Sequence, residues 1–256
     1  MDPLVAGGGC AVEATHLVVR YSGHPNPVLA IPELAVSLGD FVSIVGRSGS
    51  GKTTLLRTFA GFITPCQGTV RVLGGDPSGD SVRQRLGVLH QDPGLVPWLS
   101  VVDNVLLPLR LRGAALRREP ALNLLDGLGL AASVSRYPDQ LSGGMRTRVA
   151  IARALVTEPE LLLMDEPLGS LDEPTRADVS IVLRNLSLAR GVTVLMVTHN
   201  ITDALRVSDR LIVLRTLVNG TNLSIADDLA IRDPVGSASR DIEGEYRRAI
   251  AAIEGD

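Results

Sequence analysis

The residues best suited to chemistry lie in one glycine-rich stretch. Its sequence is Gly46-Arg47-Ser48-Gly49-Ser50-Gly51-Lys52-Thr53, followed by Thr54. It matches G-x-x-x-x-G-K-[ST], in which glycines let the backbone approach a phosphate and the amides of the next helix point toward its oxygens. Lys52, the only lysine of the sequence, suits the β- and γ-phosphates, and the Thr53 hydroxyl suits magnesium. The stretch predicts a nucleoside triphosphate site; an ordinary glycine-rich turn is the alternative.

Two carboxylates follow a short apolar run. Residues 161–164 are all apolar, and Asp165 and Glu166 come directly after them. Such a run is typical of a strand buried on both faces, and ligands of open α/β sheets bind beyond the carboxyl ends of strands. Phosphoryl transfer needs a carboxylate for magnesium and a group that orients or deprotonates water. We expect Asp165 to be the metal ligand and Glu166 the general base; a solvated loop start is the alternative.

A second glycine motif precedes a helical stretch. Ser142 can cap that helix, and Gly143 and Gly144 leave room for an anion at its first turn. On this motif alone, a plain helix cap is the simpler interpretation. As an anion site it can serve the same nucleotide as the first loop only if the fold or a partner chain brings the two together.

Two polar residues, Gln91 and His199, follow short apolar strands. An imidazole at the carboxyl edge of a sheet can contact a γ-phosphate or orient water. A capping or core histidine is the alternative for His199. Tyr21 precedes the first core strands, and by itself it is an ordinary surface aromatic.

Alternating strands and helices must position these residues. From residue 92 to 159 leucine, alanine and arginine dominate, which predicts a helical insertion between strands of a mainly parallel sheet. Gly39-Asp40 is predicted to be a hairpin turn, and residues 216–256 to hold at most one helix, Ile242–Ile253. The predicted strands are 12–21, 28–31, 34–38, 41–45, 69–73, 86–90, 161–164, 192–197 and 210–214, and the other predicted helices are 54–60, 101–112, 119–128, 145–156, 175–190 and 201–207.

Composition limits the class of protein and its partners. The 256 residues are 45% hydrophobic and 21% charged, which fits a globular protein with a sizeable core. The formal net charge is −3 without a basic stripe, so nucleic acid is not an expected partner. No apolar run approaches the ~18 residues of a membrane span, and no signal peptide is recognisable. We therefore expect a cytosolic chain whose two cysteines are reduced.

Together these motifs resemble the ATP-binding cassette (ABC) ATPases over about residues 12–215. The glycine-rich loop is similar to their Walker A loop, Leu141–Met145 to their signature and Leu161–Glu166 to their Walker B strand. The resemblance extends to Gln91 as the Q-loop glutamine, Ser170-Leu171-Asp172 as the D-loop, His199 as the switch histidine and Tyr21 as the aromatic that stacks on adenine. A P-loop kinase or GTPase would leave the signature and Asp172 unexplained.

The resemblance implies an α/β fold, the P-loop NTPase ABC cassette. Its core is a mainly parallel sheet with an N-terminal antiparallel β part and an inserted helical subdomain. The expected organisation is a single domain over residues 1–256, with the core at about 12–91 and 160–215, the helical subdomain at about 92–159 and a C-terminal tail at about 216–256.

The resemblance also implies how the motifs act. Two identical chains pair head to tail around two ATP molecules, and each chain's Ser142, Gly143 and Gly144 complete the site that the other chain's Walker A loop begins. Asp172 belongs to the same ATP-binding set. Glu166 is the expected base, His199 the contact of the γ-phosphate, and Thr53, Gln91 and Asp165 the residues around Mg2+.

A narrower resemblance is to the nitrate/sulfonate/taurine importer branch. It rests on Pro97-Trp98 and on Met145 after the glycine pair. It implies a peripheral ATPase on the cytoplasmic face of a membrane, which powers uptake of a small, anionic solute through a permease docked at Gln91–Val105, with an extracytoplasmic solute-binding protein. Trp98 is either an anchor for the permease or a packing residue, and a soluble ABC ATPase outside transport is the alternative function. Three residues depart from the family pattern without removing a catalytic group: Thr147, Gly169 and Asn200.

Overall fold

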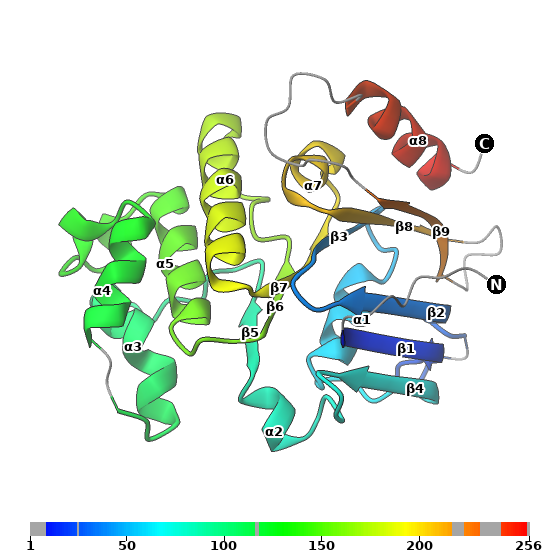
Figure 1. Ribbon diagram of the computed structural model, residues 1–256, viewed down its shortest axis with the longest axis horizontal. Coiled ribbons are helices and arrows are strands. Elements are labelled where there is room, and N and C mark those ends of the chain that lie inside the picture. The colour runs from blue at the N-terminus through cyan, green and yellow to red at the C-terminus, as the bar shows by residue number, and fades with distance from the viewer. Residues whose placement is uncertain (1–8, 25, 116–117, 217–222, 231–241, 255–256) are drawn as a thin grey trace.

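The computed structural model describes residues 9–24, 26–115, 118–216, 223–230 and 242–254. Its main layer is a six-stranded sheet of order β5-β6-β7-β3-β8-β9 (Figure 1). The first five of these strands are parallel, and β9 is antiparallel to β8. The strands are β5 Leu86–Leu89, β6 Leu161–Asp165, β7 Thr193–Thr198, β3 Phe41–Gly46, β8 Arg210–Thr216 and β9 Leu223–Ala230. The predicted mainly parallel sheet is confirmed, whereas β9 is not among the predicted elements.

A second sheet is antiparallel and has the order β2-β1-β4. Its strands are β1 Cys10–Val19, β2 Leu29–Ser37 and β4 Gln67–Val72. The prediction of two short strands at 28–31 and 34–38 is wrong, because β2 runs unbroken through Pro32. Proline is tolerated there because β2 is an edge strand, which does not need every backbone N–H for pairing.

The prediction of a hairpin at Gly39-Asp40 is also wrong. These residues do form a tight turn, with Gly39 at φ +86°. The strands on either side of it lie in different sheets, since β2 pairs with β1 while β3 pairs with β7 and β8. The Asp40 carbonyl accepts a hydrogen bond from the Val194 N–H at 2.9 Å, which ties the turn to β7. The turn therefore passes the chain from one sheet to the other.

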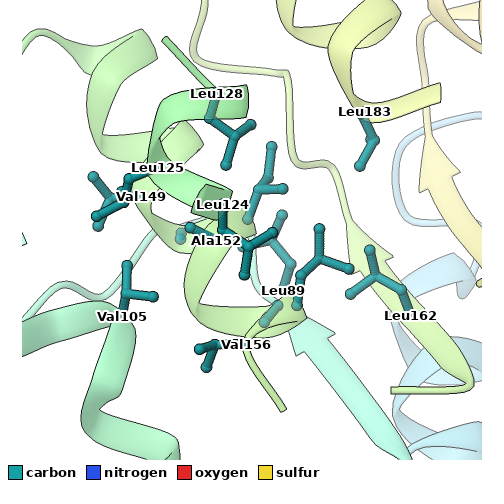
Figure 2. Packing of buried hydrophobic residues seen from close by; sticks show 14 of the residues in the cluster. Leu89, Val105, Leu124, Leu125, Leu128, Val149, Ala152, Val156, Leu162 and Leu183 are labelled. Carbon is teal, nitrogen blue, oxygen red and sulfur yellow. The ribbon is translucent and has the colours of Figure 1, made fainter. Parts of the chain in front are cut away.

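Helices cover the sheet and form a separate group beside it. The helices α3 Val101–Leu111, α4 Arg118–Gly127 and α5 Gly143–Leu155 gather on one side of the molecule (Figure 1). This confirms the predicted helical insertion. Figure 2 shows how leucines and valines of α4 and α5 pack with Leu89 of β5 and Leu162 of β6, so one apolar cluster joins the insertion to the sheet. The remaining helices are α1 Lys52–Phe59, α2 Asp80–Arg83, α6 Glu173–Arg190, α7 Ile201–Val207 and α8 Ile242–Glu254.

The C-terminal elements complete a third apolar cluster. The α8 residue Ala249 is fully buried and packs with Ile201, Ala204 and Leu205 of α7. Figure 1 shows α8 beside α7 and the β8–β9 edge of the sheet. The helix predicted at Ile242–Ile253 is thus present and covers part of the core. No helix in the described part of the chain has the length and apolar character to cross a bilayer.

Candidate active site

The glycine-rich loop joins the middle of the sheet to a helix. β3 is buried along its whole length and leads through the loop into α1 at Lys52. Gly46 has no room for a side chain, because a Cβ there would lie 2.6 Å from the Leu214 carbonyl oxygen. Gly49 and Gly51 have φ of +78° and +82°, a region that residues with a Cβ avoid. The loop therefore needs glycine at each of these positions.

Lys52 is held inside this loop. It is 6% exposed, and its Nζ donates to the carbonyl oxygens of Gly46 at 2.9 Å and Arg47 at 3.0 Å. Burial lowers the pKa of Lys52, and the carboxylates of Glu166 and Asp165 oppose this shift. A phosphate oxygen in the loop would offer the ammonium a full counter charge in place of carbonyl dipoles.

Two oxygen ligands for a cation lie side by side at the start of α1. The Thr53 hydroxyl donates to Asp165 Oδ1 at 2.9 Å, and Asp165 is 7% exposed at the end of β6. Among the described residues, no three His, Cys, Asp or Glu side chains gather closely enough to hold a metal by themselves. This donor set fits Mg2+, which prefers one or two protein oxygens together with substrate phosphates and water. We expect Thr53 and Asp165 to hold the ion, and the ion to neutralise phosphate charge.

Glu166 and His199 form a pair at the carboxyl ends of β6 and β7. His199 Nδ1 lies 3.1 Å from Glu166 Oε2, and the Glu166 N–H donates to the Val197 carbonyl at 2.9 Å. Glu166 has φ +44°, the left-handed region that is costly for a residue with a Cβ. Strained backbone of this kind clusters at functional sites, where it fixes a side chain in a useful direction. The pair can hold and deprotonate a water molecule.

A cavity of about 380 Å3 brings the loop together with Gln91 and Glu166. Its lining consists of Val28, residues 48–54, Gln91 and Glu166. Tyr21 joins this group indirectly, since its hydroxyl lies 2.9 Å from the Thr54 hydroxyl. Val28 was not among the predicted site residues, because the sequence around it predicts only an ordinary strand. The only sign in the sequence that Val28 lines the cavity is that it lies seven residues after Tyr21, across the same turn.

The signature and the D-loop lie together, apart from this cavity. Neither Ser142, Gly143, Gly144 nor Asp172 is among the described residues that line it. Ser142 caps α5 by accepting from the Met145 N–H at 3.3 Å, as predicted, and Asp172 caps α6 by accepting from the Thr175 N–H at 3.4 Å. Hydrogen bonds from Thr175 lower the pKa of Asp172.

Gly144 is the point where the signature meets α6. A Cβ at Gly144 would lie 2.4 Å from Thr175 Cγ2, so the signature helix packs directly on the first turn of α6. One chain therefore presents two separate groups of site residues.

The residues that depart from the family pattern have ordinary structural places. Thr147 is 2% exposed within α5, and Asn200 caps α7 by accepting from the Asp203 N–H at 3.1 Å. Gly169 lies beside the base, since a Cβ there would be 3.7 Å from Glu166 Oε2. Trp98 is 77% exposed, so its interpretation as a packing residue is wrong.

Comparison with known protein families identifies this architecture. The family model described as "ABC transporter" matches residues 29–169, from β2 to the turn after Glu166. The chain belongs to the ABC transporter family. It is an ABC ATPase, and ATP is its nucleotide.

Several curated relatives of this ABC ATPase carry the same name. The aliphatic sulfonates import ATP-binding protein SsuB of Pectobacterium atrosepticum is 40% identical over 224 residues, which is 88% of this chain and 80% of the relative. The protein of the same name from Pseudomonas putida is 43% identical over 198 residues, 77% of this chain and 70% of the relative. These relatives place the chain in the nitrate/sulfonate/taurine importer branch predicted from Pro97-Trp98 and Met145.

A solved structure supports the same assignment. An ATP-binding cassette described as a dimer in a post-hydrolysis state, bound to ADP and Pi, matches with a TM-score of 0.74 at 33% identity. The match covers 86% of this chain and 99% of that one. The predicted fold class, an ABC cassette of the P-loop NTPases, is thereby confirmed.

Proposed function

We propose that this ABC ATPase powers the import of an aliphatic sulfonate through a separate membrane permease. The observation that carries the chemical half is that Glu166, which pairs with His199, lines the same cavity as Lys52. The import half is supported by the relatives at 40% and 43% identity, whose names all specify sulfonate import. Those names argue against the alternative of a soluble ABC ATPase outside transport.

The residues around the cavity have different roles in the binding and hydrolysis of ATP. The loop amides and Lys52 bind the phosphates, and Tyr21 stacks on the adenine. Thr53, Asp165 and Gln91 would hold Mg2+, and the ion would neutralise charge on the phosphates. Glu166 accepts the proton of the attacking water, and His199 orients the carboxylate and contacts the γ-phosphate.

The two groups of site residues within one chain support a head-to-tail homodimer. The signature and Asp172 lie apart from the chain's own cavity, so they are available to complete the cavity of a second copy. In that arrangement the amides at the start of α5 face the γ-phosphate of the partner's ATP. Both half-sites are intact in this sequence, which favours two identical chains.

The surface around Trp98 supports a permease contact. The tryptophan lies in the loop between β5 and α3 and is 77% exposed, an unusual state for the largest apolar side chain. Aromatic residues of this kind anchor interfaces by filling a pocket on the partner. We place the permease at Gln91–Val105, the chain on the cytoplasmic face of the membrane and an extracytoplasmic solute-binding protein on the other side.

ATP-dependent dimerisation tests the composite site. The Glu166→Gln variant lacks the base, so it should retain ATP and give a particle of twice the mass in light scattering. Adding Ser142→Arg should abolish the dimer, because a long cation fills the anion site. The matched controls are Glu119→Gln on α4 and Ser81→Arg on α2, both exposed. A monomer under all conditions, with or without permease, would refute the head-to-tail arrangement.

Substrate choice needs the whole transporter. Proteoliposomes that hold the chain, its permease and the solute-binding protein should hydrolyse ATP faster when ethanesulfonate is outside. Propionate, a carboxylate of similar size, is the matched control and should have no effect. Stimulation by nitrate but not by the sulfonate would overturn the sulfonate assignment and leave the ATPase assignment intact.

A further inference from the structure

Four charged side chains form a closed ring between α6 and α7. Glu173 and Arg176 come from the first turn of α6, and Asp203 and Arg206 come from α7. Arg176 Nε lies 3.6 Å from Asp203 Oδ2, and Arg206 Nη1 lies 3.7 Å from Asp203 Oδ1. Glu173 closes the ring with Arg176 at 3.4 Å and with Arg206 at 3.3 Å. The two negative and two positive charges sum to zero, so the four side chains attract one another and the ring as a whole does not attract an outside ion.

The ring is buried at its centre. Asp203 is 2% exposed, and its side chain touches both arginines. Burial raises the pKa of Asp203, and the charges of Arg176 and Arg206 oppose that rise. Removing one partner of such a buried group leaves an uncompensated charge, so the two helices are held to each other.

Arg176 also forms a hydrogen bond with the D-loop. Its Nη2 donates to the Leu171 carbonyl at 2.7 Å, and the next residue, Asp172, is the D-loop carboxylate. Its neighbour Thr175 touches Gly144 of the signature, as described above. The Arg176 guanidinium thus contacts both the D-loop, which belongs to the residues offered to a partner chain, and Asp203 of α7.

The N-terminal end of α7 leads to the hydrolytic pair. Asp203 sits in the first turn of α7, and its N–H donates to the Asn200 side chain, which caps the helix directly after His199. A rotation of α7 therefore moves His199 and the ring together, because His199 directly precedes the cap of the short helix that carries Asp203 and Arg206.

Three atoms of the ring leave room for a tighter arrangement. Within the described part of the chain, Arg176 Nε, Asp203 Oδ1 and Arg206 Nη1 are buried and make no hydrogen bond. Buried polar atoms are usually satisfied, and the contacts of 3.6 and 3.7 Å are longer than hydrogen bonds. A shift of less than 1 Å in α7 would convert these ion contacts to hydrogen bonds.

We propose that Arg176 and Asp203 are positioning residues that couple the D-loop to the switch helix α7. Neither touches ATP. Through them, the group that a chain lends to its partner's site moves with the Glu166–His199 pair of its own site. This rests on the proposed head-to-tail dimer, because only there do the two groups serve different ATP molecules. The coupling has a two-state physical element, the ring in its loose and hydrogen-bonded arrangements.

Mixed dimers with two affinity tags test this coupling. One chain is wild type, and the other carries Glu166→Gln, so hydrolysis takes place only in the wild-type chain's site. Asp203→Asn is then added to the Glu166→Gln chain. Asp203 then lies in the chain whose own pair is inactive, so its effect on the active site of the other chain must pass through Arg176 and the D-loop. We expect hydrolysis to slow about tenfold, within the usual range of coupling between sites.

Matched variants separate the outcomes. Asp178→Asn, on an exposed face of α6, should leave the rate within about twofold. Arg176→Gln on the same chain should slow hydrolysis as much as Asp203→Asn, and the double variant no further, because both break one connection. Asp203→Glu, which keeps the carboxylate, should restore most of the rate. The affinity of each variant for ADP should stay close to wild type, and each variant should remain folded at the assay temperature, although Asp203→Asn and Arg176→Gln lower the melting temperature.

Ser142→Arg on the Glu166→Gln chain separates failure of the coupling from failure of the dimer. If it abolishes hydrolysis while Asp203→Asn does not slow it, the coupling is overturned and the proposed function stands. If Ser142→Arg has no effect, the composite site itself is wrong. Loss of rate that follows loss of ADP affinity or of folding in Asp203→Asn, without rescue by Asp203→Glu, would also overturn the positioning role.

Discussion

The contact between the signature and α6 makes a quantitative prediction for Gly144→Ala. The new methyl would lie 2.4 Å from Thr175 Cγ2, whereas carbon atoms rest at about 3.5–4.0 Å. One helix must therefore move by about 1 Å, and overpacking of this kind costs about 1–3 kcal/mol. Alanine is also a better helix former than glycine by about 1 kcal/mol, which offsets part of the loss.

Thr175→Ser removes the obstructing methyl and keeps the hydroxyl that bonds Asp172. The next neighbours of the added methyl are then Thr175 Cβ at 3.8 Å and Leu171 Cδ2 at 3.9 Å, both ordinary contacts. In this background the Gly144→Ala change should be neutral or stabilising. The difference between the two backgrounds, a coupling energy, should be about 1–3 kcal/mol.

Urea unfolding of the wild type, both single variants and the double variant measures this coupling. Far-UV circular dichroism is the suitable signal, because Trp98 is the only tryptophan and is 77% exposed. The same order should appear in function: Gly144→Ala should weaken ATP-dependent dimerisation of the Glu166→Gln chain, and Thr175→Ser should restore it. A coupling energy within about 0.5 kcal/mol of zero would refute the direct packing of the signature on α6.

Three further predictions concern the nucleotide loop, the half-buried carboxyl of Asp40 and the turn beside Glu166. ADP with magnesium at about 100 times its dissociation constant should stabilise the wild type by about 2.7 kcal/mol, and Lys52→Ala should lose that shift in thermal melting. Burial, followed by the charge of Asp209, raises the pKa of Asp40. Asp40→Asn should therefore raise the free energy of unfolding at pH 7, and the gain should disappear as the pH falls below the ordinary aspartate value of about 3.9, where both states of the wild type are protonated; a gain that persists in acid would contradict this cause. Gly169 is not in the left-handed region and has space for a methyl, so Gly169→Ala should add about 0.4–1 kcal/mol in urea unfolding and leave ATPase activity in place; a loss of stability would show that the turn needs glycine.

Most of the candidate site could be predicted from the sequence because its chemistry is local. Lys52 and Thr53 follow glycines at the spacing of a phosphate-binding loop, and Asp165 and Glu166 follow an apolar run that is typical of a buried strand. The parallel order of β6, β7 and β3 then brings their carboxyl ends together, as the general rule for such sheets requires.

The parts that failed depend on contacts between distant segments. The turn at Gly39-Asp40 has the local chemistry of a hairpin, but pairing of β3 with β7 and β8 places its two flanking strands in different sheets. β9 carries two adjacent aspartates, so neither alternation nor apolar content marks it as a strand. Its partner β8 decides its conformation. In the ring of Glu173, Arg176, Asp203 and Arg206, spacing marks only the i,i+3 pair within each helix, and nothing in the sequence shows that the two pairs meet across helices.

Because the backbone of Glu166 is left-handed, selection for stability and selection for ATPase activity favour different residues at position 166. A residue with a Cβ at φ +44° costs roughly 1–2 kcal/mol, and glycine or asparagine at the same position relieves most of it. A library screened only for heat resistance should therefore enrich replacements of Glu166 by these two residues, each of which removes the proposed base. Variants inactivated at this position would then be more heat-stable than the active chain. Position 166 would be the first to sequence in any thermostabilised clone that no longer hydrolyses ATP.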